Sequence, residues 1–181
     1  MRNLLKILLA GTLIFMVLAI GQEWEFFSTS WLGNDEKTVE MTDEDRQEAV
    51  DSVYLMLNLM RHLYSSDGDP RFADRMPVSE AVLREMLDDV EYLVKNQRRQ
   101  DPELMRLEIR SVEPVDERRV QVHTRELWIM RLSWLTGTGE SEPPHSQVLY
   151  GKYLVMRGSQ GWQVEAWDFD EPVGEEGPSP S

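Results

Sequence analysis

The chain has 181 residues, no cysteine and a formal net charge of −14. This length suits one folded domain of about 130 residues with additional terminal segments, and the lack of cysteine excludes disulfides, thiol catalysis and iron–sulfur ligation. Residues 1–21 carry two basic side chains and no acidic one, so the remainder carries −16. Because so acidic a body repels phosphate backbones, we expect no nucleic-acid partner, whereas a basic protein remains a candidate.

The N-terminal segment MRNLLKILLAGTLIFMVLAIG has a basic start followed by an apolar run over residues 4–21. We expect Lys6, within that run, to extend its amine back to the headgroups. A helix of this length spans roughly 27 Å, close to the thickness of about 30 Å of a bilayer's hydrocarbon core. Basic residues precede the run and acidic residues follow it, so the positive-inside rule predicts a cytoplasmic N-terminus and an exported body.

A cleaved signal peptide is the alternative, because Ala19-Ile20-Gly21 fits the small-x-small pattern of a signal-peptidase site. No polar segment precedes that site, and an aromatic cluster follows it, as at a membrane interface. The cluster consists of Trp24, Phe26, Phe27 and Trp31. We therefore predict a retained anchor with its interfacial rim over residues 1–27, followed by a linker over residues 28–41.

Two helices are predicted next. Thr42 is a suitable N-cap for the first, with three acidic residues in the first turn. Its apolar residues recur at helical spacing: Val50, Val53, Tyr54, Leu57, Met60, Leu63 and Tyr64. The turn residues SSDGDP end this helix, and a single helical turn is expected around Phe72. Ser79 caps the second helix, which is expected to fray within KNQRRQDP. The apolar face of the second helix comprises Val82, Leu83, Met86, Leu87, Val90 and Val94.

After Pro102 the hydrophobic period changes to two, which predicts strands. The first is LMRLEIRSVEPV, with Leu107 and Ile109 facing inward. The second, VQVHTRELWIMRLSWL, is long enough to require a bulge or bend. QVLYGKYLVMR and WQVEAWDF form the last two strands around the GSQG hairpin, and residues 171–181 form a flexible tail. The sequence predicts an α+β domain over residues 42–170, with two main helices on a curved four-stranded antiparallel sheet.

The ending YLVMRGSQGWQVEAWDF resembles the NTF2-like (cystatin-like cone) superfamily, whose members typically finish with a hairpin and then Gly-Trp-x-Val. Here that motif is Gly161-Trp162-Gln163-Val164, followed by Trp167, and the resemblance covers residues 43–170. RVQVHTRELWIM also resembles the long penultimate strands of the superfamily. A third helix and extra first strands are not visible, so a reduced version of the fold stays open. The superfamily includes isomerases and hydrolases, as well as many members with no catalysis, so the resemblance assigns no reaction.

No catalytic residue, metal site or cofactor motif is predicted. The three histidines lack a metal-ligand spacing and are expected at the surface: His62, His123 and His145. Asp67-Gly68-Asp69 resembles the start of a calcium loop, but the later glutamate of such a loop is missing, so we interpret it as a turn. Two acidic clusters are expected to be solvated, although paired carboxylates can perform acid–base chemistry. These clusters are Asp88-Asp89-Glu91 and Asp168-Asp170-Glu171.

Aromatic and sulfur-containing residues are concentrated in the predicted sheet. In ELWIMRLSWL both strand faces are apolar, so one face can pack on the helices. The other face either docks a partner, since interfaces favour tryptophan, tyrosine and methionine, or is buried as the sheet curls. The candidate docking residues are Trp128, Met130, Trp134, Tyr150 and Tyr153.

Together these features predict a non-catalytic accessory or scaffold subunit of a larger bacterial membrane complex of respiratory, photosynthetic or secretion type. The expected partners are integral membrane subunits, the bilayer through residues 4–21, and a basic periplasmic protein such as an electron carrier. The chain would be a single-pass protein of the inner membrane with a periplasmic domain, a layout that resembles VirB8-like scaffolds. The alternative is an exported small-ligand binder or enzyme, for which an open cone lined by Asp, His or Tyr is expected.

Overall fold

The computed structural model describes residues 41–136, 142–159 and 161–170. The predicted anchor, its aromatic rim, most of the linker and the tail 171–181 lie outside these residues and stay predictions. Among the helices of the described ranges, none combines the length and the apolar character that a membrane crossing requires.

Helix α2, Asp43–Ser65, begins as predicted. The Thr42 side chain accepts a hydrogen bond from the Asp45 amide at 3.1 Å, and three acidic residues occupy the first turn. The buried residues of α2 are Ala49, Val53, Met56, Leu57, Leu59, Met60 and Leu63. Tyr54 was predicted on this face but is 54% exposed. The buried stripe is centred on Val53 and Leu57, and Tyr54 lies about 100° round the helix from Val53.

The one-turn helix expected around Phe72 is α3, Pro70–Ala73. Helix α4, Glu80–Lys95, is capped by Ser79, whose side chain accepts from the Val82 amide at 3.3 Å. The fraying predicted after α4 is wrong: Gln97 has a left-handed backbone with φ 57°, and a strand begins at the next residue. A left-handed residue ends a helix sharply because it redirects the backbone.

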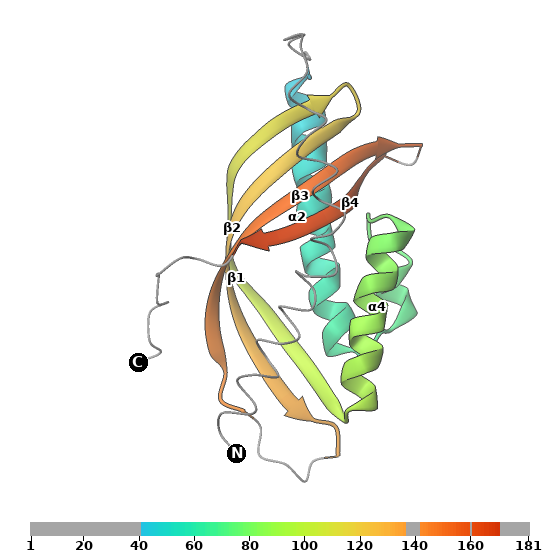
Figure 1. Cartoon of the computed structure of the whole chain (residues 1–181), viewed down its shortest axis with the longest axis vertical. Helices are drawn as coiled ribbons and strands as arrows, with labels where there is room; N and C mark the ends of the chain where they lie inside the picture. The colour runs from blue at the N-terminus through green and yellow to red at the C-terminus, as the bar shows by residue number, and fades with distance from the viewer. Residues whose placement is uncertain (1–40, 137–141, 160, 171–181) are drawn as a thin grey trace. The chain divides into compact units, whose positions relative to one another are not determined.

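Four strands form one antiparallel sheet in the order β1-β2-β3-β4, as predicted. They are β1 Arg98–Asp116, β2 Arg119–Trp134, β3 His145–Gly158 and β4 Gly161–Asp170. β1 has 19 residues against 16 in β2, and the register between them shifts three times. Each shift inserts one extra residue in β1 and so bends the pair. Both strands curve near their middle in Figure 1, so the predicted bend is present, with the bulges on the partner of β2.

Helices α2 and α4 lie on one side of the sheet (Figure 1), and the inward side chains of β2 alternate with its outward ones. The inward set is Val120, Val122, Thr124, Glu126 and Trp128, all buried. Ile109 pairs with Thr124 and therefore shares this face. It remains 38% exposed, contrary to the prediction of an inward core residue, because β1 is the edge strand of the sheet that the described residues form.

The connection between α3 and α4 covers the opposite edge of the sheet. The Ser79 amide donates to the Val164 carbonyl at 2.8 Å, and the Val164 amide donates to the Pro77 carbonyl at 2.8 Å. These bonds form a parallel bridge between Val78 and Val164. Ser79 therefore both caps α4 and fastens its first turn to β4.

Gly151 on β3 lies where no larger residue fits. A Cβ atom there would be 2.5 Å from Thr124 Oγ1, 2.6 Å from Tyr153 Cε2 and 2.8 Å from Glu126 Oε1. These separations are well inside van der Waals contact, so the neighbours would have to move.

We expect Gly151→Ala to lower the free energy of unfolding by about 1–3 kcal/mol, because overpacking a filled core forces side chains off their rotamers. The matched control is Gly158→Ala on the same strand, where the nearest atom to a Cβ is 3.6 Å away, and it should change stability by no more than about 0.5 kcal/mol. Urea unfolding of both variants measures this. Equal losses in the two variants would contradict the packing argument.

Candidate functional site

A carboxyl group lies at the centre of the domain interior. Glu126 is 0% exposed. Its Oε1 accepts from the Thr124 hydroxyl at 2.6 Å and the Tyr153 hydroxyl at 2.6 Å, and its Oε2 accepts from the Trp128 indole at 2.7 Å. Among the described residues no basic side chain pairs with it. Burial raises the pKa of Glu126, and the three hydrogen bonds oppose that rise.

Strand periodicity assembles this group. Thr124, Glu126 and Trp128 are two residues apart, so all three point to the helix-covered face. The Tyr153 hydroxyl reaches the carboxyl from β3. Gly151, also on β3, has no side chain and so leaves room for Thr124, Glu126 and Tyr153 to meet. Sequence reasoning missed Glu126, although a signal was present. Placing Val120 and Val122 inward also places residues 124, 126 and 128 inward by the same alternation.

The space around Glu126 is filled by large side chains. The largest fully buried residues include Trp128, Tyr153, Met56, Leu57, Leu63 and Met86. Its three hydrogen-bond donors are all protein groups, and solvent does not reach the carboxyl. The hydrogen bonds of Glu126 are therefore made within the core, to side chains of β2 and β3.

Two of the predicted docking residues belong to this core. Trp128 is 2% exposed and Tyr153 is 0% exposed, so neither can contribute contact surface, and their assignment as docking residues is wrong. Strand alternation places them on the helix-covered face, which the sequence did not distinguish from the open one. The structure does not bring Met130, Trp134 and Tyr150 together: Tyr150 lies on the opposite face from the other two.

Trp134 closes β2 and is 37% exposed. The Arg98 guanidinium lies 3.6 Å from the centre of its ring and pairs with Glu142 at 2.9 Å. A cation over an aromatic face is attracted by the ring electrons, so this exposed tryptophan is held in one orientation beside an ion pair. Met130, Trp134 and Tyr150 stay predictions as docking residues.

The face of the sheet turned away from the helices carries an apolar band, here called the outer band. Cross-strand pairing and alternation assign it Leu127, Ile129, Val148, Tyr150, Leu154 and Met156. Val148 is buried within the band, and the others are partly exposed. Charged side chains lie within it: Lys152, which pairs with Asp170 at 2.6 Å, falls between Tyr150 and Leu154, and Arg125, which pairs with Glu108 at 3.7 Å, precedes Leu127. The outer band therefore combines apolar side chains with ion pairs, as protein interfaces also do.

Among the described residues, the acidic charge is concentrated on the helical layer. Residues 41–97, which form α2, α3 and α4, contain thirteen acidic and six basic side chains. Residues 98–134, which form β1 and β2, contain eight arginines and seven acidic side chains. The two sides of the domain therefore differ electrostatically: the helices are acidic and the first hairpin is nearly balanced.

The histidines lie at the surface, as predicted. His62 is exposed and stacks on Phe72 at 5.1 Å between ring centres. His123 has a side chain 27% exposed and lies 4.0 Å from Glu113, and His145 is exposed at the start of β3. In the part of the chain that the structure describes, no three His, Asp or Glu side chains gather closely enough to hold a metal ion.

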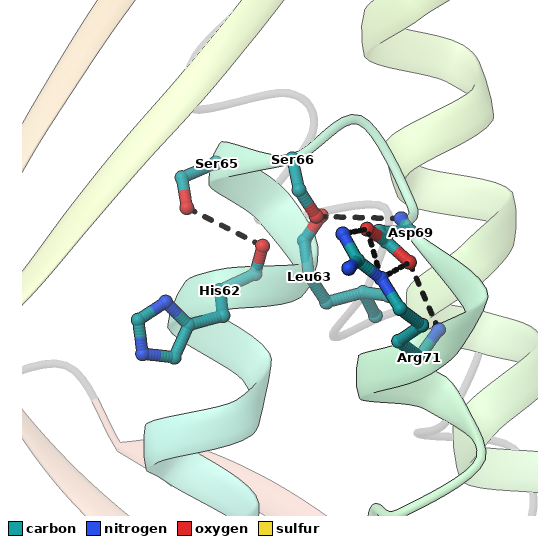
Figure 2. A network of polar contacts seen from close by, with 6 residues as sticks. All are labelled: His62, Leu63, Ser65, Ser66, Asp69 and Arg71. Atoms are coloured by element: carbon teal, nitrogen blue, oxygen red, sulfur yellow. Dashed lines mark hydrogen bonds and ion pairs between the residues drawn. The ribbon is translucent and has the colours of Figure 1, made fainter.

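Asp67-Gly68-Asp69 is a turn, as predicted. Asp67 and Gly68 have left-handed backbones with φ 59° and 87°. Figure 2 shows Asp69 beyond the end of α2, where it accepts from the Arg71 amide at 3.0 Å and pairs with the Arg71 guanidinium at 2.5 Å. In the same view the Ser66 hydroxyl accepts from the Asp69 amide at 3.3 Å. The Asp69 carboxylate is therefore hydrogen-bonded to Arg71 of the same turn.

The acidic cluster on α4 is only partly solvated. Asp88 and Glu91 are exposed, as predicted, but Asp89 is half-buried and accepts from the Tyr64 hydroxyl at 3.2 Å. The prediction of a fully solvated cluster is therefore wrong for Asp89, because α4 turns that side chain toward α2. In the other cluster Asp168 accepts from the Phe169 amide and Asp170 pairs with Lys152, while Glu171 lies outside the described residues.

Neither a protein-family model nor a curated protein sequence matches the chain. The crystal structure of the intermembrane space region of the chloroplast protein ARC6 aligns with a TM-score of 0.62 at 16% identity, covering 74% of this chain and 100% of that one. At this identity the similarity concerns the fold alone.

Two further structures align with lower scores. A cystatin-like domain of unknown function from Nostoc punctiforme has a TM-score of 0.40 at 19% identity, covering 74% and 81% of the two chains. A TrwG component of a type IV secretion system from Bartonella birtlesii has a TM-score of 0.39 at 17% identity, covering 71% and 94%. The domain has the NTF2-like, cystatin-like fold that the sequence resemblance predicts.

Glu126→Gln should change how stability depends on pH. Because burial raises the pKa of Glu126 above the ordinary value of 4.5 for a glutamate, the stability that the carboxyl contributes is complete below that value and is lost as pH rises through the folded-state pKa. We expect the stability advantage of the native protein over Glu126→Gln to shrink between about pH 4.5 and pH 7.5, by about 1.4 kcal/mol for each unit of pKa shift.

Urea unfolding at several pH values measures this difference. Glu117→Gln, at an exposed turn position, is the matched control and should track the native protein throughout. A stability difference between the native protein and Glu126→Gln that stays constant with pH would rule out a shifted titration of Glu126.

Proposed function

We propose that the chain is a non-catalytic accessory or scaffold subunit of a larger bacterial membrane complex, of respiratory, photosynthetic or secretion type. The outer band carries this proposal: one face of the sheet packs on the helices, and the other presents partly exposed Leu127, Ile129 and Tyr150. Partly exposed hydrophobic side chains on an open face, with ion pairs among them, favour contact with another protein.

The proposed location is the bacterial inner membrane, with the N-terminus in the cytoplasm and the domain of residues 42–170 in the periplasm. Charge asymmetry around residues 4–21 and the aromatic residues that follow support it. The ARC6 region with the same fold is described as an intermembrane space region, and the periplasm is likewise a compartment between membranes.

The contents of the interior favour scaffolding over catalysis or ligand binding. An enzyme or small-ligand binder built on the cone needs an open cavity with a reachable polar group. Glu126 is fully buried and bonded to three protein donors, and large residues such as Met56 and Trp128 are packed within the same interior.

The two sides of the domain suit two kinds of partner. The first hairpin has a nearly balanced charge and contributes to the outer band. We therefore expect the outer band to bind a membrane subunit that presents an apolar surface. The acidic helical layer, with thirteen acidic side chains, suits a basic periplasmic protein, whose approach such a charge would accelerate at low ionic strength.

We expect Leu127→Glu combined with Leu154→Glu to release the chain from its complex, because each places a charge in the apolar band. Tyr92→Glu is the control: Tyr92 is 48% exposed on α4, on the other side of the sheet. Tagged full-length protein, extracted in mild detergent, is analysed by native gel and mass spectrometry, and circular dichroism verifies folding. Migration of the native chain as a lone 21.1 kDa monomer in every detergent would refute the scaffold proposal.

Sequencing the N-terminus of the mature protein tests the anchor. We expect the start of the mature chain to lie upstream of residue 4 and the protein to resist carbonate extraction from membranes, because the apolar run 4–21 stays attached. A mature chain that begins at Gln22 would identify the segment as a cleaved signal and contradict the membrane-subunit proposal.

A further inference from the structure

Two acidic residues of α4 contact the rest of the domain through aromatic donors. Glu85 and Asp89 are four residues apart, so they lie on one face of the helix. The Tyr64 hydroxyl of α2 donates to Asp89 at 3.2 Å, and the Trp167 side chain of β4 lowers the pKa of Glu85 against the rise that burial causes. Both carboxyls are half-buried, which joins the acidic face of α4 to two other elements.

No basic side chain in the described ranges pairs with either carboxyl. On α4 itself the nearest titratable neighbour is Asp88, which is also acidic. Tyr64 is the titratable group from α2, and β4 contributes Trp167, which does not titrate.

The cations at the start of β1 are engaged elsewhere. Arg98 pairs with Glu142, and Arg99 pairs with Asp67. The turn before α3, which contacts Val90 through Gly68, contributes the acids Asp67 and Asp69, each paired with an arginine. In the described part of the chain, burial and the neighbouring acids therefore act on the two carboxyls of α4 without an ion pair to offset them.

The apolar attachment of α4 is narrow. Its buried residues are Val82, Met86 and Val90, whereas α2 buries seven. Its first turn is fastened to β4 through Ser79, and the residue pair just after the helix is fastened to the end of β2, because the Leu135 amide donates to the Gln97 carbonyl at 3.0 Å. Glu85 and Asp89 lie between these two attachments, so a change in their charge acts on the packing of the middle of the helix.

We propose that α4 is a proton-responsive element, which packs tightly on α2 and β4 when Glu85 and Asp89 are protonated and loosens when they ionise. Ionisation places two like charges one turn apart in a half-buried site, beside Asp88, with no cation to balance them. Because both ends of the helix stay attached to the sheet, loosening concentrates in the middle of the helix. This property goes beyond the proposed scaffold role and does not depend on it.

The direction follows from linkage. Burial raises the pKa of Glu85 above 4.5 and that of Asp89 above 3.8. A carboxyl with a raised folded-state pKa contributes stability that is complete below its unfolded value and is lost as pH rises through the folded value. The helix is therefore tightest in acid and loosens toward neutral pH.

Hydrogen exchange of the full chain in mild detergent tests the proposal. Protection of the α4 amides, corrected for intrinsic exchange rates, is measured at about pH 4.5 and about pH 7.5. We expect native protection to fall toward neutral pH, about tenfold for each unit of pKa shift. Glu85→Gln combined with Asp89→Asn should retain its acid-level protection at the higher pH.

The control variant is Glu80→Gln combined with Glu91→Gln, which removes the same formal charge from exposed positions of α4 and should lose protection as the native chain does. Equal pH dependence in all three proteins would overturn the proposal. As a second readout in the native chain, the Trp167 indole proton resonance should shift over the same pH range, and a resonance that stays fixed would also contradict it.

Discussion

A carboxylic acid cannot be sealed inside a protein unless its oxygens are satisfied, and this requirement governs the centre of the domain. Glu126 needs donors on both oxygens, and Thr124, Tyr153 and Trp128 supply them. Their placement fixes the pairing of β2 with β3 and demands a glycine at position 151. A one-residue slip of β2 would turn Glu126, Thr124 and Trp128 to the outer face and leave the buried Tyr153 hydroxyl without its acceptor, so the network favours a single register.

The curvature of the sheet follows from the same pair of strands that carries this network. β1 fits against β2 only by accommodating extra residues, which bends both strands around the helices. The bend encloses the inner face under α2 and α4, and the outer band is left on the other side. The core and the outer band are thus two faces of one alternating pattern, and the helices cover only one of them.

The sequence predicted the helices, their caps, the strand order and the fold, because N-caps, turn residues and hydrophobic periods are local signals. The sequence did not predict that Glu126 is buried, because an acidic residue in a strand is normally expected to face solvent. Only the alternation that starts from Val120 indicates that Glu126 faces inward. The sequence led to the assignment of Trp128 and Tyr153 as docking residues because both faces of β2 are apolar. Only the position of the helices shows which of the two faces is buried. The burial of Asp89 depends on how α4 is rotated against α2, which helical spacing alone does not specify.

The irregular pairing of β1 has a consequence for how the domain behaves at high concentration. An uncovered edge strand presents unpaired amide and carbonyl groups that can recruit another strand, which is a common start of aggregation. On β1 the ladder is interrupted at Met105, Arg110 and Val115, the residues inserted at the three register shifts. An incoming straight strand could match it over only a few residues before losing register, so the bulges that curve the sheet also discourage edge-to-edge polymerisation.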